Sequence, residues 1–168
     1  MLPDRPAVIP LNVMTDSVAI LYRASLAGEA IPKSRWKQIS DYALKMFPNP
    51  GLAFADAHAA LAHAMAGKRD RLETIIEGAR GPAGHVVAAI GRAFRGFADG
   101  DPEAAISNLT GIMAEHERIG GSRAQRDLIE FALAKALVDV GRSDEAKRML
   151  DMHRPHTSHD HAIKGLLN

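Results

Sequence analysis

The sequence contains no cysteine, which excludes disulfides and thiolate chemistry and fits a reducing compartment. Aromatic residues make up only 5% of the chain, and alanine fills much of the apolar pattern. Small residues let helices approach closely, so this composition suits helix-on-helix packing better than a β-sandwich. No run approaches the roughly 18 apolar residues that span a bilayer, and the first residues lack the pattern of a secretory signal. We therefore expect a cytoplasmic protein with no membrane partner.

The sequence also lacks a large net charge and any pattern typical of a β-strand. The formal net charge is +1, so no overall field points to nucleic acid. No window alternates with period two, and β-branched residues are sparse, so we expect no strands. Without a strand there is no phosphate-binding loop that follows one. The chain also lacks a nucleophile elbow and a His-Glu-x-x-His helix.

Helical hairpins are what the sequence does contain. The segment 131–150 reads as an apolar helix, a stop at Gly141, a capped restart at Ser143 and a second apolar helix. Glycine stops at positions 28, 67, 100 and 141 recur at intervals of about 33 to 41 residues, close to the repeat length of about 34 in tetratricopeptide units. This pattern predicts an all-α, right-handed superhelical array of about four antiparallel hairpins.

Proline and histidine divide the chain into three predicted parts. Residues 1–14, which hold three prolines, are predicted as an irregular N-terminal arm, and Thr15-Asp16-Ser17 is predicted to cap the first helix. The repeat domain is predicted over 15–155, and a His-rich tail with a short terminal helix over 156–168. Inside the domain, the cap at Asp101 is predicted to start a helix that runs to about Arg118.

The segment Arg118-Ile-Gly-Gly-Ser-Arg-Ala-Gln-Arg-Asp127 carries a distinctive polar motif. It resembles the Gly-Gly-Ser-His-Ala-Gln-Arg-Asp element in the C-terminal part of the tetratricopeptide repeat protein 38 family, with Arg123 in place of the histidine. Two further segments resemble elements of the same family. One is Phe54-Ala-Asp-Ala-His58-Ala, and the other is Asp16-Ser-Val-Ala-Ile-Leu-Tyr-Arg, followed by Arg35-Trp36. The resemblance covers about residues 15–155 and implies a repeat fold. It also implies either a freestanding short relative or a separate partner that supplies the family's N-terminal half.

The element Gly120–Asp127 is the most specific motif. Ser122 can cap a helix whose free N–H groups hold an anion, with Arg123 and Arg126 adding positive charge. The structural alternative, which we favour, is a tight turn whose polar residues, Gln125 among them, tie adjacent hairpins by buried hydrogen bonds.

Two histidine patterns suggest chemistry less strongly. Asp56 and His58 lie two apart on one helix, so they diverge and cannot grip one small group; we expect one in the inner groove and the other bracing a neighbour. The tail His153-x-x-His156-x-x-His159-x-His161 contains the commonest metal ligand. Pro155 would break a helix that aligned these rings, so we favour a solvated tail and expect no metal and no cofactor.

We favour a non-catalytic scaffold that grips a protein or peptide on the concave face of the array, with an acidic or C-terminal carboxylate segment as ligand. The predicted binding residues are His58, Arg92, Arg95, Arg126, Lys135, Asp56 and Asp127. The alternative is an enzyme or enzyme subunit with a polar pocket between repeats, formed by Asp56, His58 and Asp127. Exposed ends of the array also allow a homodimer.

Overall fold

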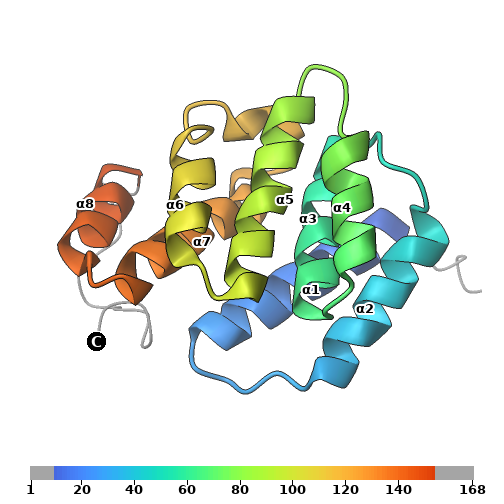
Figure 1. The fold of residues 1–168 in the computed structure, drawn as a ribbon, viewed down its shortest axis with the longest axis horizontal. Coiled ribbons are helices and arrows are strands. Elements are labelled where there is room, and N and C mark those ends of the chain that lie inside the picture. Colours follow the sequence, from blue (N-terminus) through green and yellow to red (C-terminus); the bar gives the residue numbers. More distant parts are fainter. Residues whose placement is uncertain (1–9, 154–168) are drawn as a thin grey trace, which may run out of the picture.

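The computed structural model describes residues 10–153, and all regular structure in this range is helical (Figure 1). The elements are α1 (Pro10–Leu26), α2 (Lys33–Met46), α3 (Ala53–Met65), α4 (Arg69–Gly78), α5 (Gly84–Asp99), α6 (Pro102–Thr110), the 3-10 helix η1 (His116–Ile119), α7 (Arg123–Asp139) and α8 (Ser143–His153). The predicted all-α class is therefore confirmed over these residues. None of the described helices is long and apolar enough to cross a membrane.

The turn between α5 and α6 forms as its residues predict. Gly100 adopts the left-handed conformation, with φ 73°, and the Asp101 N–H behind it donates to the Gly96 carbonyl. The Asp101 carboxylate then accepts a 2.9 Å hydrogen bond from Ala104 N, and Pro102 occupies the first turn of α6. A glycine stop followed directly by a capped start thus folds one helix back on the other.

The first helix begins earlier than the sequence pattern predicts. It starts at Pro10, so residues 10–14 of the predicted arm are helical, and residues 1–9 lie outside the described range. Proline is tolerated in a first turn because its missing N–H has no partner there. Thr15 does not cap the helix; its hydroxyl donates to the Leu11 carbonyl one turn back. Met14 and Val18 are fully buried one turn apart, and this apolar stripe extends the helix toward Pro10.

The sixth helix ends earlier than predicted. It ends at Thr110, and a series of turns leads to η1, so the predicted helix to Arg118 is wrong. A β-branched residue followed by Gly111 is a weak point for helix propagation. Hydrogen bonds from Ile112 N to Leu109 O and from Glu115 N to Ile112 O tighten the chain into turns. Ile112 still reaches the core, and η1 is placed beside the start of α7.

The helices pack as four consecutive pairs around one contiguous core. Each pair (α1 with α2, α3 with α4, α5 with α6, α7 with α8) is in contact, and α3 packs on both α1 and α5. Helix α7 also packs on α1, and the Arg23 guanidinium donates to the Ala124 carbonyl across this junction. Edge-on rings of Tyr22 and Phe94, with centroids 6.2 Å apart, join α1 to α5. The first helices of the pairs therefore use one face for core contacts with each other: α1 packs on α3 and α7, and α3 packs on α5.

Helix α3 lies at the centre of this arrangement. It contacts α1, α2, α4, α5 and η1, and every residue from Phe54 to Ala64 is buried. A helix surrounded by other helices needs mostly small or apolar side chains on every face, which explains the many alanines of α3. The polar groups of α3 must then find partners inside the protein.

Candidate functional site

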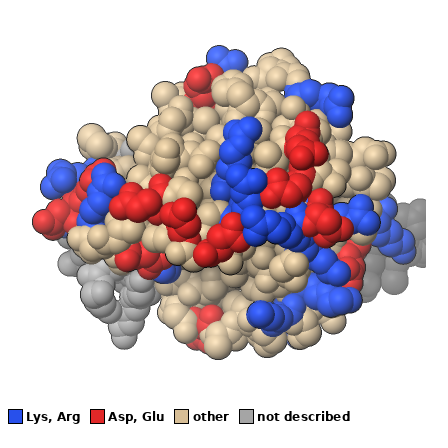
Figure 2. Space-filling model, viewed as in Figure 1, with Lys and Arg blue, Asp and Glu red and all other residues tan. Residues whose placement is uncertain are grey.

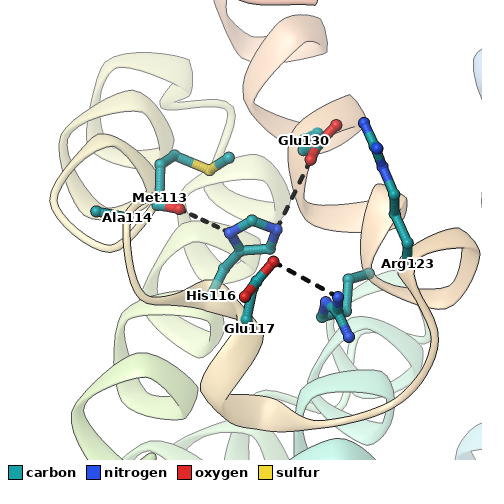
Figure 3. Close-up of a pocket in the computed structure, with 7 residues that line it drawn as sticks. Met113, Ala114, His116, Glu117, Arg123 and Glu130 are labelled. Atoms are coloured by element: carbon teal, nitrogen blue, oxygen red, sulfur yellow. Dashed lines mark hydrogen bonds and ion pairs between the residues drawn. The ribbon is translucent and has the colours of Figure 1, made fainter. Parts of the chain in front are cut away.

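A pocket of about 270 Å³ lies between the α6–η1 turn, η1 itself and the first two turns of α7 (Figure 3). Its wall carries two arginines, two glutamates and one histidine beside two apolar residues. The lining residues are Met113, Ala114, His116, Glu117, Arg123, Arg126 and Glu130. The pocket adjoins the Gly120–Asp127 motif, so the most specific element of the sequence forms one wall of it.

The start of α7 is fixed by a reciprocal cap. Ser122 Oγ accepts a hydrogen bond from Gln125 N, and Gln125 Oε1 accepts one of 2.8 Å from Ser122 N. The predicted cap at Ser122 is confirmed. The Gln125 side chain serves its own helix instead of tying adjacent hairpins together. This cap fixes the direction of α7, and therefore the position of the arginines in its first turn.

Gly121 brings the turn against α3. Its φ is +79°, and a Cβ built on it would lie 2.3 Å from Cε2 of Phe54. Only glycine meets both conditions, because a side chain would be strained at that φ and would also collide with the ring. Two of the three segments that carry the family resemblance are thus in direct contact. The His58 ring stands edge-on to the same Phe54 ring, with centroids 4.5 Å apart.

Arg126 lies at the inner wall of the pocket, with only 16% of its side chain exposed. Its Nη1 donates to the Gly121 carbonyl, and its Nη2 lies 3.7 Å from Glu117 Oε1. Its buried Nε has no hydrogen-bond acceptor among the described residues. A guanidinium with five N–H donors therefore has one edge that is not hydrogen-bonded.

His116 and Glu130 join η1 to α7 behind the arginines. Since a carbonyl oxygen only accepts, the 2.7 Å bond to the Met113 carbonyl places a proton on His116 Nδ1. Nε2 is thereby turned toward Glu130, with 3.7 Å between it and Oε1 (Figure 3). Both side chains are buried. The sequence reasoning missed both residues, although Glu130 is one turn beyond Arg126 on the same helix face.

The predicted groove pair on α3 does not face an open surface. Asp56 is buried, and its Oδ2 accepts a 2.8 Å hydrogen bond from Gly51 N; burial raises the pKa of this carboxyl. His58 is 1% exposed and donates from Nδ1 to the Phe54 carbonyl, one turn back in the same helix. Burial lowers the pKa of His58 to about 4. Each group thus has a backbone partner, while His58 Nε2 is buried and has no hydrogen-bond partner among the described residues.

The remaining predicted binding residues lie on α5 and α7. Arg92 is exposed on α5. Arg95 donates to both Glu73 oxygens at 3.1 Å, which braces α5 against α4. Lys135 pairs with Asp139 within α7. Asp127 is half-buried beside Arg126.

Charges of both signs are mixed over the surface. Figure 2 shows acidic and basic side chains side by side in a band across one face. Among residues 10–153, no group of three His, Asp or Glu side chains is placed to hold a metal ion. The tail histidines beyond His153 lie outside the described residues. The face seen in Figure 2 is therefore not uniformly basic.

Comparison with known proteins identifies no relative. No model of a known protein family matches the chain, and neither does any curated protein or solved structure. Guanidinium, imidazole and carboxylate groups around a partly open space can recognise a ligand by charge and hydrogen bonding.

Proposed function

We propose that this chain is a non-catalytic binding module that recognises an acidic group of a protein or peptide partner in the pocket between η1 and α7. The observation that carries the proposal is Arg126, a largely buried arginine that lines the pocket with one edge not hydrogen-bonded. Arg123 lines the same pocket from one turn earlier. Arginine forks match the two oxygens of a carboxylate, so an acidic side chain or a C-terminal carboxylate suits this wall.

The pocket supplies only part of the binding energy. A hydrogen bond to a charged group contributes on the order of 1.5–3 kcal/mol, which alone gives weak affinity. The rest must come from contacts of the partner around the pocket. A protein or a peptide provides such contacts, whereas a small isolated anion does not.

The arrangement of the four helix pairs is part of the same proposal. We propose that the four hairpins form a short tetratricopeptide-like array related to the tetratricopeptide repeat protein 38 family, with a separate partner supplying that family's N-terminal half. The glycine spacing and the resemblance of three segments support this relation. Core contacts between α1, α3 and α5 and between α1 and α7 leave the η1–α7 pocket as the better candidate, so we propose the ligand site there.

A peptide library tests the proposal. Random peptides with free C-terminal carboxylates, and the same peptides as C-terminal amides, are offered to the protein and to its Arg126→Gln variant. We expect acidic or free-carboxylate peptides to be selected, with binding that weakens at high salt and is lost in the variant. Arg142→Gln is the matched control, because Arg142 is an exposed arginine that also pairs with glutamates. Selection that is equal for the protein and the Arg126 variant would refute the proposal.

A further inference from the structure

We infer that Glu117 acts as an internal competitor at the pocket, occupying the free edge of Arg126 until a carboxylate ligand displaces it. The inference rests on the proposed function and names the ligand group as a singly charged carboxylate. It also assigns to η1 a role in setting affinity, since η1 carries Glu117.

The geometry of Arg126 identifies the edge. Nη1 is engaged by the Gly121 carbonyl, so the end of the guanidinium formed by Nη1 and Nη2 is half occupied. The other edge, formed by Nε and Nη2, has no hydrogen-bond acceptor among the described residues. Two parallel N–H groups on this edge match the two oxygens of one carboxylate. A bidentate carboxylate is therefore the ligand group that fits.

Glu117 is placed to occupy this edge weakly. Its Oε1 lies 3.7 Å from Nη2, too far for a hydrogen bond, and 75% of its side chain is exposed. Because the two charges are 3.7 Å apart and the glutamate is exposed, this pair contributes little stability and is weakened by salt. Glu117 lies on η1 and Arg126 on α7, and both line the pocket, so this pair joins its two sides. A ligand carboxylate with better geometry can replace it at small cost.

The charges of the pocket lining favour a ligand group with one negative charge over a group with two. The charged groups of the lining are Arg123, Arg126 and Glu130 on α7 and Glu117 on η1. With Glu117 displaced, two positive side chains remain against one negative side chain. A carboxylate then balances the wall, whereas a doubly charged phosphate leaves an excess of negative charge beside buried Glu130.

The test titrates the folded protein with sodium acetate and follows the Arg126 Nε–H resonance by NMR, with sodium chloride at equal ionic strength as reference. Inorganic phosphate is titrated in the same way. We expect a saturable shift with acetate, and binding about two- to five-fold tighter in Glu117→Gln, the range expected for removal of a weak ion pair whose glutamate is exposed. Phosphate is expected to bind more weakly than acetate. Arg126→Lys keeps the charge but loses both the fork and the Nε–H, so its acetate binding is followed by the backbone amide resonances around the pocket. It is expected to lose acetate binding.

A matched control separates competition from a general charge effect. Glu103 is 67% exposed and lies 3.9 Å from Arg142, so Glu103→Gln makes the same charge change at a similar pair. We expect its acetate affinity to equal that of the wild-type protein. Equal affinities for Glu117→Gln and the wild type, a shift that does not saturate, or tighter binding of phosphate would overturn the inference. In each of these cases, peptide binding that still depends on Arg126 would leave the proposed function standing.

Discussion

His63 Nδ1 lies 2.8 Å from Ser40 Oγ, and this bond joins α3 to α2 inside the protein. Burial, reinforced by nearby Arg71, lowers the pKa of His63 to about 4. His58, deeper in the same helix, is shifted by burial to the same value. In the unfolded chain both rings titrate near the ordinary histidine value of about 6.5. Two buried neutral histidines therefore link folding to pH.

We predict that the free energy of unfolding falls as pH drops from about 6.5 to about 4. In this window the unfolded chain binds protons that the folded chain excludes, so acid favours unfolding. Each histidine accounts for on the order of 3 kcal/mol across the whole window. Urea denaturation at a series of pH values measures the slope. The variants His58→Gln and His63→Gln should each flatten it. A wild-type stability that is constant across the window would contradict the assignment.

The close approach of Gly121 to Phe54 gives a second prediction. Gly121→Ala places a methyl group 2.3 Å from the ring at a φ of +79°, so it combines overpacking with backbone strain. Gly100→Ala is the control, because Gly100 has a φ of +73° and no atom within 4 Å of the added Cβ. We expect Gly100→Ala to cost about 1–2 kcal/mol and Gly121→Ala about 2 kcal/mol more. Equal melting temperatures for the two variants would show that the ring contact is unimportant.

Asp56 gives a third prediction. Its Oδ2 accepts from Gly51 N, and burial raises its pKa, so the hydrogen bond is favourable while the buried charge is not. Asp56→Asn keeps an oxygen acceptor and removes the charge, whereas Asp56→Ala leaves the Gly51 N–H without its acceptor. We expect the alanine variant to be less stable than the asparagine variant by about 1 kcal/mol at neutral pH. Thermal unfolding of the two proteins measures the difference, and the reverse order would contradict it.

Local signals predicted much of the fold. The stop at Gly100, the cap at Asp101 and the cap at Ser122 act through residues within one turn of each other, so the sequence pattern is sufficient to find them. The start of α1 was mispredicted because Thr15-Asp16-Ser17 resembles a cap in isolation. The burial of Met14 decides otherwise, and that depends on helices distant in the sequence.

The candidate site was only partly predictable. Arg126 was a predicted binding residue, and it lines the pocket. His116 and Glu130 meet only because α6 ends at Thr110 and η1 folds back on α7, which no local pattern indicates. His58 was expected to face a groove or brace a neighbour, but α3 is surrounded by other helices and the ring donates from Nδ1 to the backbone of its own helix. Tertiary packing decided these positions.

Amide chemical-shift mapping with an acidic peptide selected by the protein tests the central claim most directly. The proposed function predicts that the largest shifts fall on residues 113–130, around the pocket and Arg126, and disappear in Arg126→Gln. Shifts centred instead on Arg92 or Lys135, or a map that is unchanged in the variant, would contradict it.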